Sequence, residues 1–176
     1  FILPVLLSCA SSGDVLPQAS KSYVWPQAPD RPRFQYETEL RTAESIQESK
    51  VKSFLERFAT STVQEPAARD VFFKPYAIAA QHGRIYVTDT ALALVHVFDV
   101  PRRRYFQFGY RFEGKLNKPV GVALDAKGFV YVSDAGAKRV VVYDAYGLFQ
   151  RFIGHADGLQ NPSGVAVSKD GARIFV

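Results

Sequence analysis

Short apolar runs separated by small polar turns repeat along residues 72–176 of this 176-residue chain. Runs such as 84–88 and 129–133 are rich in Val, Ile and Tyr and are bounded by Gly, Asp, Pro or Lys, a pattern typical of β-strands. The pattern predicts four strands per unit. We place them at 76–80, 84–88, 94–99 and 104–109, then at 120–124, 129–133, 139–144 and 148–153, with a third unit starting at 163–167 and 172–176.

One motif occurs three times at nearly constant spacing. It is centred on Pro75, Pro119 and Pro162, which are 44 and 43 residues apart (119 − 75 and 162 − 119). A period of about 40–45 residues is typical of a chain in which each unit is one four-stranded propeller blade. The nearly continuous apolar run at 140–143 fits a sheet that is covered on both faces. The pattern therefore predicts an all-β fold, a β-propeller with about two and a half blades present.

Four aspartates occupy equivalent places in the first two units. Asp89 and Asp134 are 45 residues apart, and so are Asp99 and Asp144. Each follows a strand at a predicted turn, where a carboxylate accepts backbone N–H groups. Their repetition predicts a structural role, and a catalytic or ligand-binding role is the alternative.

The repeated motifs also resemble a known family. Pro-x-Gly-Val-Ala, then Val-Tyr-Val-Ser-Asp at 130–134, then Arg-Val-Val-Val-Tyr-Asp at 139–144, resembles the NHL repeat. The resemblance covers 72–176 and implies a β-propeller, which is most often six-bladed in this family. It implies no particular reaction, because one fold supports many functions. We expect the chain to be a fragment, because it lacks an initiator Met and ends inside its third unit.

Upstream of the repeats, the chain has three further parts. Residues 34–40 alternate apolar and polar side chains and are expected to form a strand that closes the propeller ring. Residues 42–60 have a helical pattern, interpreted as an insertion packed on the first blade, or else as a helix that docks on a partner or a membrane surface. The expected organisation is a signal-peptide end with a lipobox at 1–9, an extended tether at 10–33, the ring-closing strand and helical insertion at 34–71, and blades at 72–116, 117–160 and 161–176, the last truncated.

The single cysteine lies in a short motif near the start. The segment Leu6-Leu7-Ser8-Cys9 follows an apolar run and resembles the bacterial lipobox. The resemblance implies that Cys9 is acylated and that the protein is a lipoprotein of the bacterial cell envelope, with Ala10 favouring the outer membrane. The alternative is an ordinary free or buried cysteine.

The chain carries a formal net charge of +5, with its densest basic run at 102–104. That run is interpreted as a solvated sheet edge, and the alternative is contact with an anionic partner such as lipid, glycan or RNA. No alternation of aromatic and basic residues that would stack bases stands out, so nucleic acid is the less favoured partner.

No motif of an enzyme or a cofactor site is present. The three histidines lack metal-binding spacing, and His155 with Asp157 forms the one pair placed on a possible ligand-face loop. We predict no catalytic residue, metal or cofactor, and a binding or scaffold module for a protein or glycan partner. The alternative is a metal-dependent propeller hydrolase or lyase, lactonase-like or NHL-lyase-like, with its site largely in blades outside this chain. The residues that follow the blade prolines, Tyr76, Val120 and Ser163, are poor metal ligands.

Overall fold

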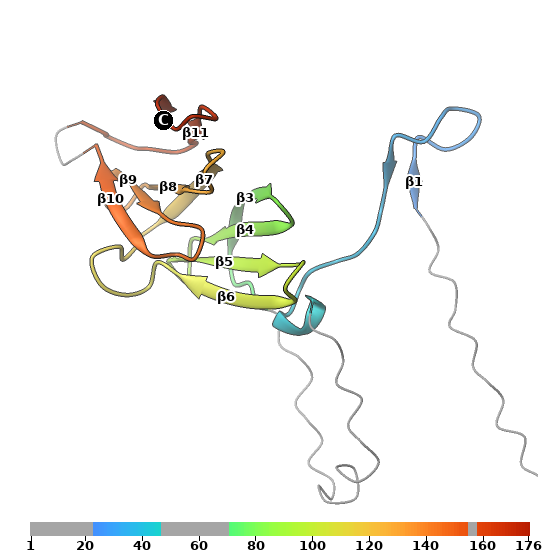
Figure 1. Cartoon of the computed structure of the whole chain (residues 1–176), viewed down its shortest axis with the longest axis horizontal. Coiled ribbons are helices and arrows are strands. Elements are labelled where there is room, and N and C mark those ends of the chain that lie inside the picture. Colours follow the sequence, from blue (N-terminus) through green and yellow to red (C-terminus); the bar gives the residue numbers. More distant parts are fainter. Residues whose placement is uncertain (1–22, 47–70, 155–157) are drawn as a thin grey trace, which may run out of the picture. The chain divides into compact units, whose positions relative to one another are not determined.

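The structure, a computed structural model, describes residues 23–46, 71–154 and 158–176, and its regular structure is almost entirely β (Figure 1). The chain divides into two compact units, Phe1–Thr38 and Glu39–Val176, which are described separately. Within the three described ranges, no helix has the length and apolar character needed to cross a membrane.

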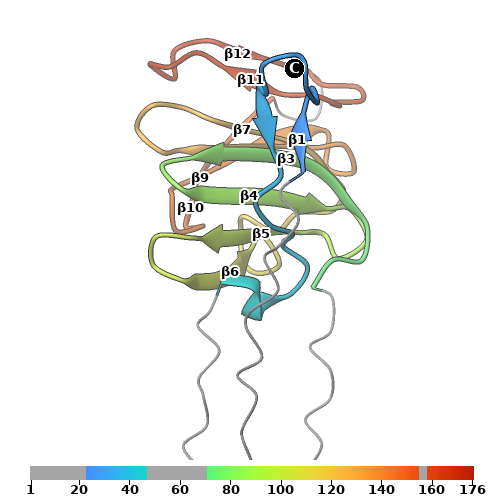
Figure 2. The ribbon, with the colours of Figure 1, turned by 90° about the vertical axis from the view of Figure 1, so that its right-hand side faces the viewer.

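The first four-stranded sheet, called blade 1, is an antiparallel meander. Its strands are β3 (Pro75–Gln81), β4 (Arg84–Asp89), β5 (Leu94–Asp99) and β6 (Arg104–Phe108). They lie side by side in chain order (Figure 2). The predicted strand at 104–109 ends one residue earlier, because Gly109 has a φ of +88° and leaves the extended conformation.

The second sheet, called blade 2, has the same order. Its strands are β7 (Pro119–Leu124), β8 (Val130–Asp134), β9 (Arg139–Tyr143) and β10 (Phe149–Ile153). In both blades the pairing of the first two strands shifts register directly after the proline, between Pro75 and Ile78 and between Pro119 and Gly121. Such an irregularity accommodates a residue without an N–H donor. The predicted four-stranded blades are thereby confirmed.

The third unit contains a two-stranded antiparallel pair. β11 (Ala166–Val167) pairs with β12 (Ile174–Phe175), inside the two segments predicted as strands. A backbone hydrogen bond ties this pair to blade 2, since the N–H of Ala126 donates to the carbonyl of Lys169 at 2.8 Å.

Blade 2 is covered on both faces, which explains its continuous apolar runs. Alternate residues on β8 and β9 belong to different clusters, because successive side chains of a strand point to opposite faces. The face toward blade 1 packs against Tyr86, Val95, Val97 and Phe108 and contributes Val130, Val132, Val141 and Tyr143. The opposite face contributes Tyr131, Val140 and Val142, which pack against Val165, Val167 and Ile174 of the third unit.

A partly buried arginine joins the two blades at one end. The Nε of Arg84 pairs with Asp99 Oδ2 at 2.8 Å within blade 1, and its Nη1 donates to the carbonyl of Ala145 in blade 2 at 3.0 Å. Its guanidinium also lies 4.8 Å from the ring centre of Tyr146. One side chain therefore fixes blade 1 to the β9–β10 turn of blade 2.

The N-terminal unit differs from the sequence predictions. The strand expected at 34–40 is only β2 (Phe34–Gln35), and it pairs with β1 (Val24–Trp25), which lies inside the segment expected to be an extended tether. Both short strands expose aromatic side chains, so burial does not extend the pairing further. Closure of a propeller ring by this segment stays a prediction.

The helix predicted at 42–60 starts as a short 3-10 turn. The turn, η1 (Ala43–Ile46), is held by the N–H of Ser45 donating to the carbonyl of Thr42 at 3.1 Å. Ser45 Oγ also accepts from the N–H groups of Arg41 and Thr42. The turn lies against β5 and β6 of blade 1. The rest of the predicted helix lies outside the described residues.

Two glycines at equivalent positions allow a test of the packing between blade 2 and the third unit. A Cβ on Gly121 would lie 2.5 Å from Ser133 Oγ and 2.8 Å from the carbonyl of Ser163, whereas one on Gly164 would meet nothing within 4 Å. We expect Gly121→Ala to lower the free energy of unfolding by about 1–3 kcal/mol through overpacking. Gly164→Ala should leave it unchanged or raise it by up to about 1 kcal/mol. Urea denaturation of both variants measures this, and equal losses in the two would contradict the packing described.

Candidate functional site

A buried carboxylate organises the entry into blade 1. Asp89, at the end of β4, is fully buried, and its Oδ2 accepts the N–H groups of Phe73 at 2.7 Å and Lys74 at 2.9 Å. Its Oδ1 accepts the N–H groups of Ala91 and Leu92, each at 3.0 Å. The carboxylate thus joins the segment before β3 to the β4–β5 turn, and both of its oxygens are occupied.

Blade 2 repeats this arrangement around Asp134. Its Oδ2 accepts the N–H of Asn117 at 2.9 Å, and its Oδ1 accepts that of Lys118 at 2.8 Å and that of Ala137 at 3.2 Å. The equivalent carboxylates therefore share one task, which is to hold the start of the first strand onto the second hairpin.

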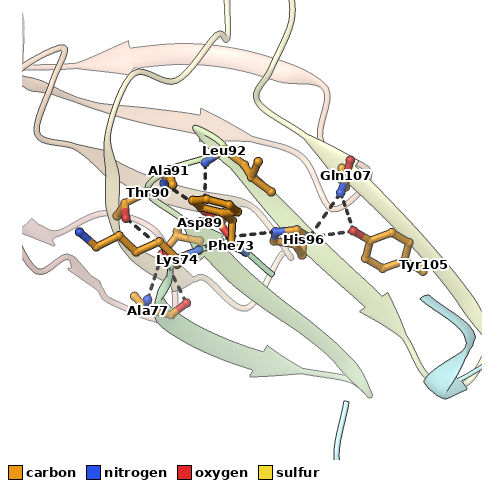
Figure 3. A network of polar contacts seen from close by, with 11 residues as sticks. Phe73, Lys74, Ala77, Asp89, Thr90, Ala91, Leu92, His96, Tyr105 and Gln107 are labelled. Atoms are coloured by element: carbon orange, nitrogen blue, oxygen red, sulfur yellow. Dashed lines mark hydrogen bonds and ion pairs between the residues drawn. The ribbon is translucent and has the colours of Figure 1, made fainter. Parts of the chain in front are cut away.

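Beside Asp89, blade 1 contains a polar network that blade 2 lacks (Figure 3). His96 on β5 is fully buried, and its Nδ1 lies 2.7 Å from the hydroxyl of Tyr105 on β6. The Nε2 of Gln107 donates to the same hydroxyl at 2.5 Å. On the other side of the ring, His96 Nε2 lies 3.6 Å from Asp89 Oδ2. The four side chains form a line across β4, β5 and β6.

The donors in this line determine where the imidazole proton lies. Because the Tyr105 hydroxyl accepts from Gln107, its own proton is free to go to Nδ1 of His96, which makes Nδ1 the acceptor and places the ring proton on Nε2. Nε2 is buried without a hydrogen-bond partner, because the nearest carboxylate oxygen, on Asp89, lies beyond hydrogen-bond reach. The Phe72 ring packs edge-on against the imidazole at 4.9 Å.

The pKa values of these groups follow from their surroundings. Burial lowers the pKa of His96 below its ordinary 6.5, and the nearby Asp89 carboxylate offsets only part of this. For Asp89, burial raises the pKa, but the four backbone N–H donors outweigh burial and hold the pKa below 3.8. At neutral pH the network therefore contains a neutral imidazole beside an ionised carboxylate. Protonation of the imidazole would change this contact between His96 and Asp89.

The network is visible in the sequence only as a departure from the repeat. At an offset of 45 residues, His96 corresponds to Val141 and Tyr105 to Gln150. Arg84, which corresponds to Phe129, is a second departure of this kind, and such departures are visible only when the two units are aligned.

The other aspartates of the repeat occupy hairpin turns at the opposite end of the strands. Asp99 is buried and pairs with Arg84; burial raises its pKa, but the contacts to Arg84 and Arg102 bring that pKa below 3.8. Asp144 accepts the N–H groups of Tyr146 at 2.8 Å and Leu148 at 2.9 Å, both through Oδ1.

The remaining predicted site residues, Cys9, His155 and Asp157, lie outside the described residues. In the part of the chain that the structure describes, no group of three His, Cys, Asp or Glu side chains is placed to hold a metal ion. In the Asp89–His96–Tyr105–Gln107 line, Asp89 and His96 are fully buried, and Tyr105 and Gln107 are half-buried.

Comparison with known proteins bears on the second unit most directly. The NHL repeat family model matches residues 116–143, which confirms the predicted repeat there. None of the curated proteins matches the chain significantly in sequence.

Several solved structures are similar to this chain. Hydrazine synthase of Kuenenia stuttgartiensis shares 20% identity over 66% of this chain, with a TM-score of 0.49. A catalytically inactive virginiamycin B lyase from Staphylococcus aureus with quinupristin shares 15% over 56%, with a TM-score of 0.46, and a luciferin-regenerating enzyme shares 15% over 56%, with a TM-score of 0.45. The chain spans about a third of each of these proteins, at 32%, 32% and 34% of their lengths.

The two kinds of aspartate predict different responses to loss of charge. In Asp89→Asn an amide nitrogen replaces one of two oxygens that each accept two N–H groups, so donors face donors. We expect a loss of at least about 2 kcal/mol of folding free energy. Asp144→Asn retains the single oxygen that accepts both bonds and should cost less than about 1 kcal/mol. Thermal and urea denaturation compare the two, and a larger loss in Asp144→Asn would contradict this account.

The buried imidazole predicts an acid-dependent stability. Because the pKa of His96 is lowered on folding, the unfolded chain binds this proton first as pH falls. The contribution of the neutral His96 side chain to the free energy of unfolding is complete above pH 6.5. Below that pH it decreases by up to about 1.4 kcal/mol per pH unit. We expect His96→Val, which copies blade 2, to flatten the stability between about pH 7 and about pH 5.

His82→Asn serves as the control for this measurement. His82 is exposed in a turn with a φ of +50°, a conformation that Asn tolerates. Urea denaturation at several pH values gives the slope of the unfolding free energy against pH. We expect His82→Asn to keep the slope of the unsubstituted protein. A slope in His96→Val as steep as that of the unsubstituted protein would contradict the role assigned to His96.

Proposed function

We propose, from the premise that residues 116–143 are an NHL repeat within a four-stranded propeller blade, that this protein is a non-enzymatic binding module. It acts at a bacterial cell envelope, attached by lipid on Cys9, and presents the ends of its blades to a protein or glycan partner. The outer membrane is the proposed site of attachment, with the blades facing the periplasm or the exterior.

The observation that carries the proposal is the full use of the repeated carboxylates. In both Asp89 and Asp134, each carboxylate oxygen accepts at least one backbone N–H group, so neither residue has an unoccupied oxygen to offer a metal or substrate. The polar groups that recur from blade to blade support strands, and the surface differs from blade to blade. This division is what a scaffold with variable contacts requires.

One end of the blades is suited to a partner. The β5–β6 and β9–β10 turns expose Val100 and Tyr146 at 44% and 64%, with exposed Arg102 and Arg104 close by in sequence. Arginine and aromatic side chains are enriched at protein interfaces because they combine apolar area with directional hydrogen bonds. Arg84 bonds to Asp99 beside one turn and to Ala145 in the other, and so fixes the position of the two turns relative to each other.

Lipid attachment supplies the location in this proposal. A chain of buried methylenes contributes about 0.8 kcal/mol per group, and more than one acyl chain makes attachment stable. With Cys9 as the mature N-terminus, the segment up to residue 33 separates the lipid from the blades.

One purification of the full-length protein and its Cys9→Ala variant tests both parts of the proposal. We expect cells fed labelled fatty acid to label the protein and not Cys9→Ala. We also expect less than one equivalent of Ca²⁺ or Zn²⁺ per chain by elemental analysis of the purified protein. Equal labelling of the two proteins would overturn the lipid attachment. A stoichiometric metal would instead favour the metal-dependent hydrolase or lyase.

A further inference from the structure

The link between β6 and β7 is a closed loop with a firmly held base. The N–H of Leu116 donates to the carbonyl of Gly109 at 2.7 Å, and that of Lys115 donates to the carbonyl of Phe112 at 3.0 Å. Leu116 is 1% exposed and belongs to the core between the blades. The loop therefore leaves and rejoins the fold at one point.

Blade 2 holds the second half of this loop. The hydroxyl of Tyr143 donates to the carbonyl of Gly114, and Arg139 Nη2 donates to that of Lys115 at 3.2 Å. A Cβ on Gly114 would lie 2.9 Å from both Tyr143 and Phe149, so the backbone rests directly on those rings. These contacts fix the orientation of the tip.

The tip points apolar side chains into water. Phe112 is 90% exposed and has a φ of +57°, a conformation that is unfavourable for a bulky residue. Tyr110 is 41% exposed, with the guanidinium of Arg111 4.8 Å from its ring centre. This Tyr-Arg-Phe sequence alternates aromatic and basic residues. Neither solvation nor packing within the described fold explains the exposure of Phe112.

The surroundings of the tip are basic. In an antiparallel meander, the β4–β5 and β8–β9 turns lie at the same end of the blades as the β6–β7 link. Within the β4–β5 turn, the β8–β9 turn, the β6–β7 link and residues 73–74, Glu113 is the one exposed acidic side chain, because Asp89 and Asp134, which end β4 and β8, are buried. The exposed basic side chains there are Lys74, Arg111, Lys115, Lys118 and Lys138.

We propose that this end of the blades docks on an anionic lipid bilayer, with Phe112 and Tyr110 entering the interfacial layer and the lysines contacting headgroups. Aromatic side chains favour the membrane interface, and each nearby basic residue strengthens attraction to anionic lipids. A protruding tip suits a broad, flat bilayer, whereas single-stranded nucleic acid is bound along grooves. The contact goes beyond the proposed partner module, whose exposed turns lie at the other end, and it does not depend on acylation of Cys9.

The test uses the unacylated full chain, Cys9→Ala, with vesicles of phosphatidylcholine alone or mixed with phosphatidylglycerol. We expect cosedimentation with the mixed vesicles only, weakened by added salt. Phe112→Asn should weaken it by about tenfold or more, because Asn tolerates the positive φ and removes the apolar group. Leu148→Asn removes an exposed apolar side chain at the opposite end and should leave vesicle binding unchanged.

A spectroscopic readout reports the depth of the tip directly. With Trp25→Phe removing the single native tryptophan, Phe112→Trp should show a blue-shifted emission when mixed vesicles are added. Equal sedimentation of Phe112→Asn and its parent, with no shift of emission, would overturn the proposal. The proposal would also be overturned if the protein bound single-stranded RNA or dextran sulfate but did not bind the mixed vesicles. Because Cys9 is absent from every variant, neither result depends on the lipid attachment.

Discussion

The architecture depends on the need of each sheet to cover two apolar faces. Blade 2 buries Val132 and Val141 against blade 1 and Val140 and Val142 against the third unit. A single sheet of this composition would leave both faces in water, and exposed apolar surface lowers the free energy of unfolding. The blades therefore stabilise each other mainly by burying apolar surface. Polar contacts, such as those of Arg84 with Asp99 and Ala145, add to this hydrophobic interface.

The carboxylates of Asp89 and Asp134 meet a second requirement, which blades 1 and 2 share. The chain enters the first strand of each blade through a segment whose N–H groups have no ladder partners. One carboxylate satisfies several of them at once. In blade 1 the same carboxylate also faces an imidazole, so a structural device common to the blades acquires a local sensitivity to protons.

Most of the fold was predictable from the sequence, because spacing and alternation reflect contacts inside one repeat. The eight strands of the two blades, and the turn aspartates such as Asp144, follow from that pattern. The N-terminal segment was not predictable in the same way, since the alternation at 34–40 extends well beyond the two residues that pair as β2. The His96 network and the Phe112 tip could not be predicted from the repeat. Both consist of residues that the two units do not share, and a pattern of shared residues gives no information about them.

The hydrogen bond between Leu116 and Gly109 separates the β6–β7 tip from the spacing of the blades. Changes of length or composition at 110–113 can be absorbed outside this closure, without shifting the register of any strand and without touching the contacts of blade 2 with Gly114 and Lys115. The chain itself shows such latitude, because its two complete units differ in length beyond their closing glycines, Gly109 and Gly154. The position is therefore a natural insertion site, at which a foreign peptide could be displayed on an undisturbed scaffold.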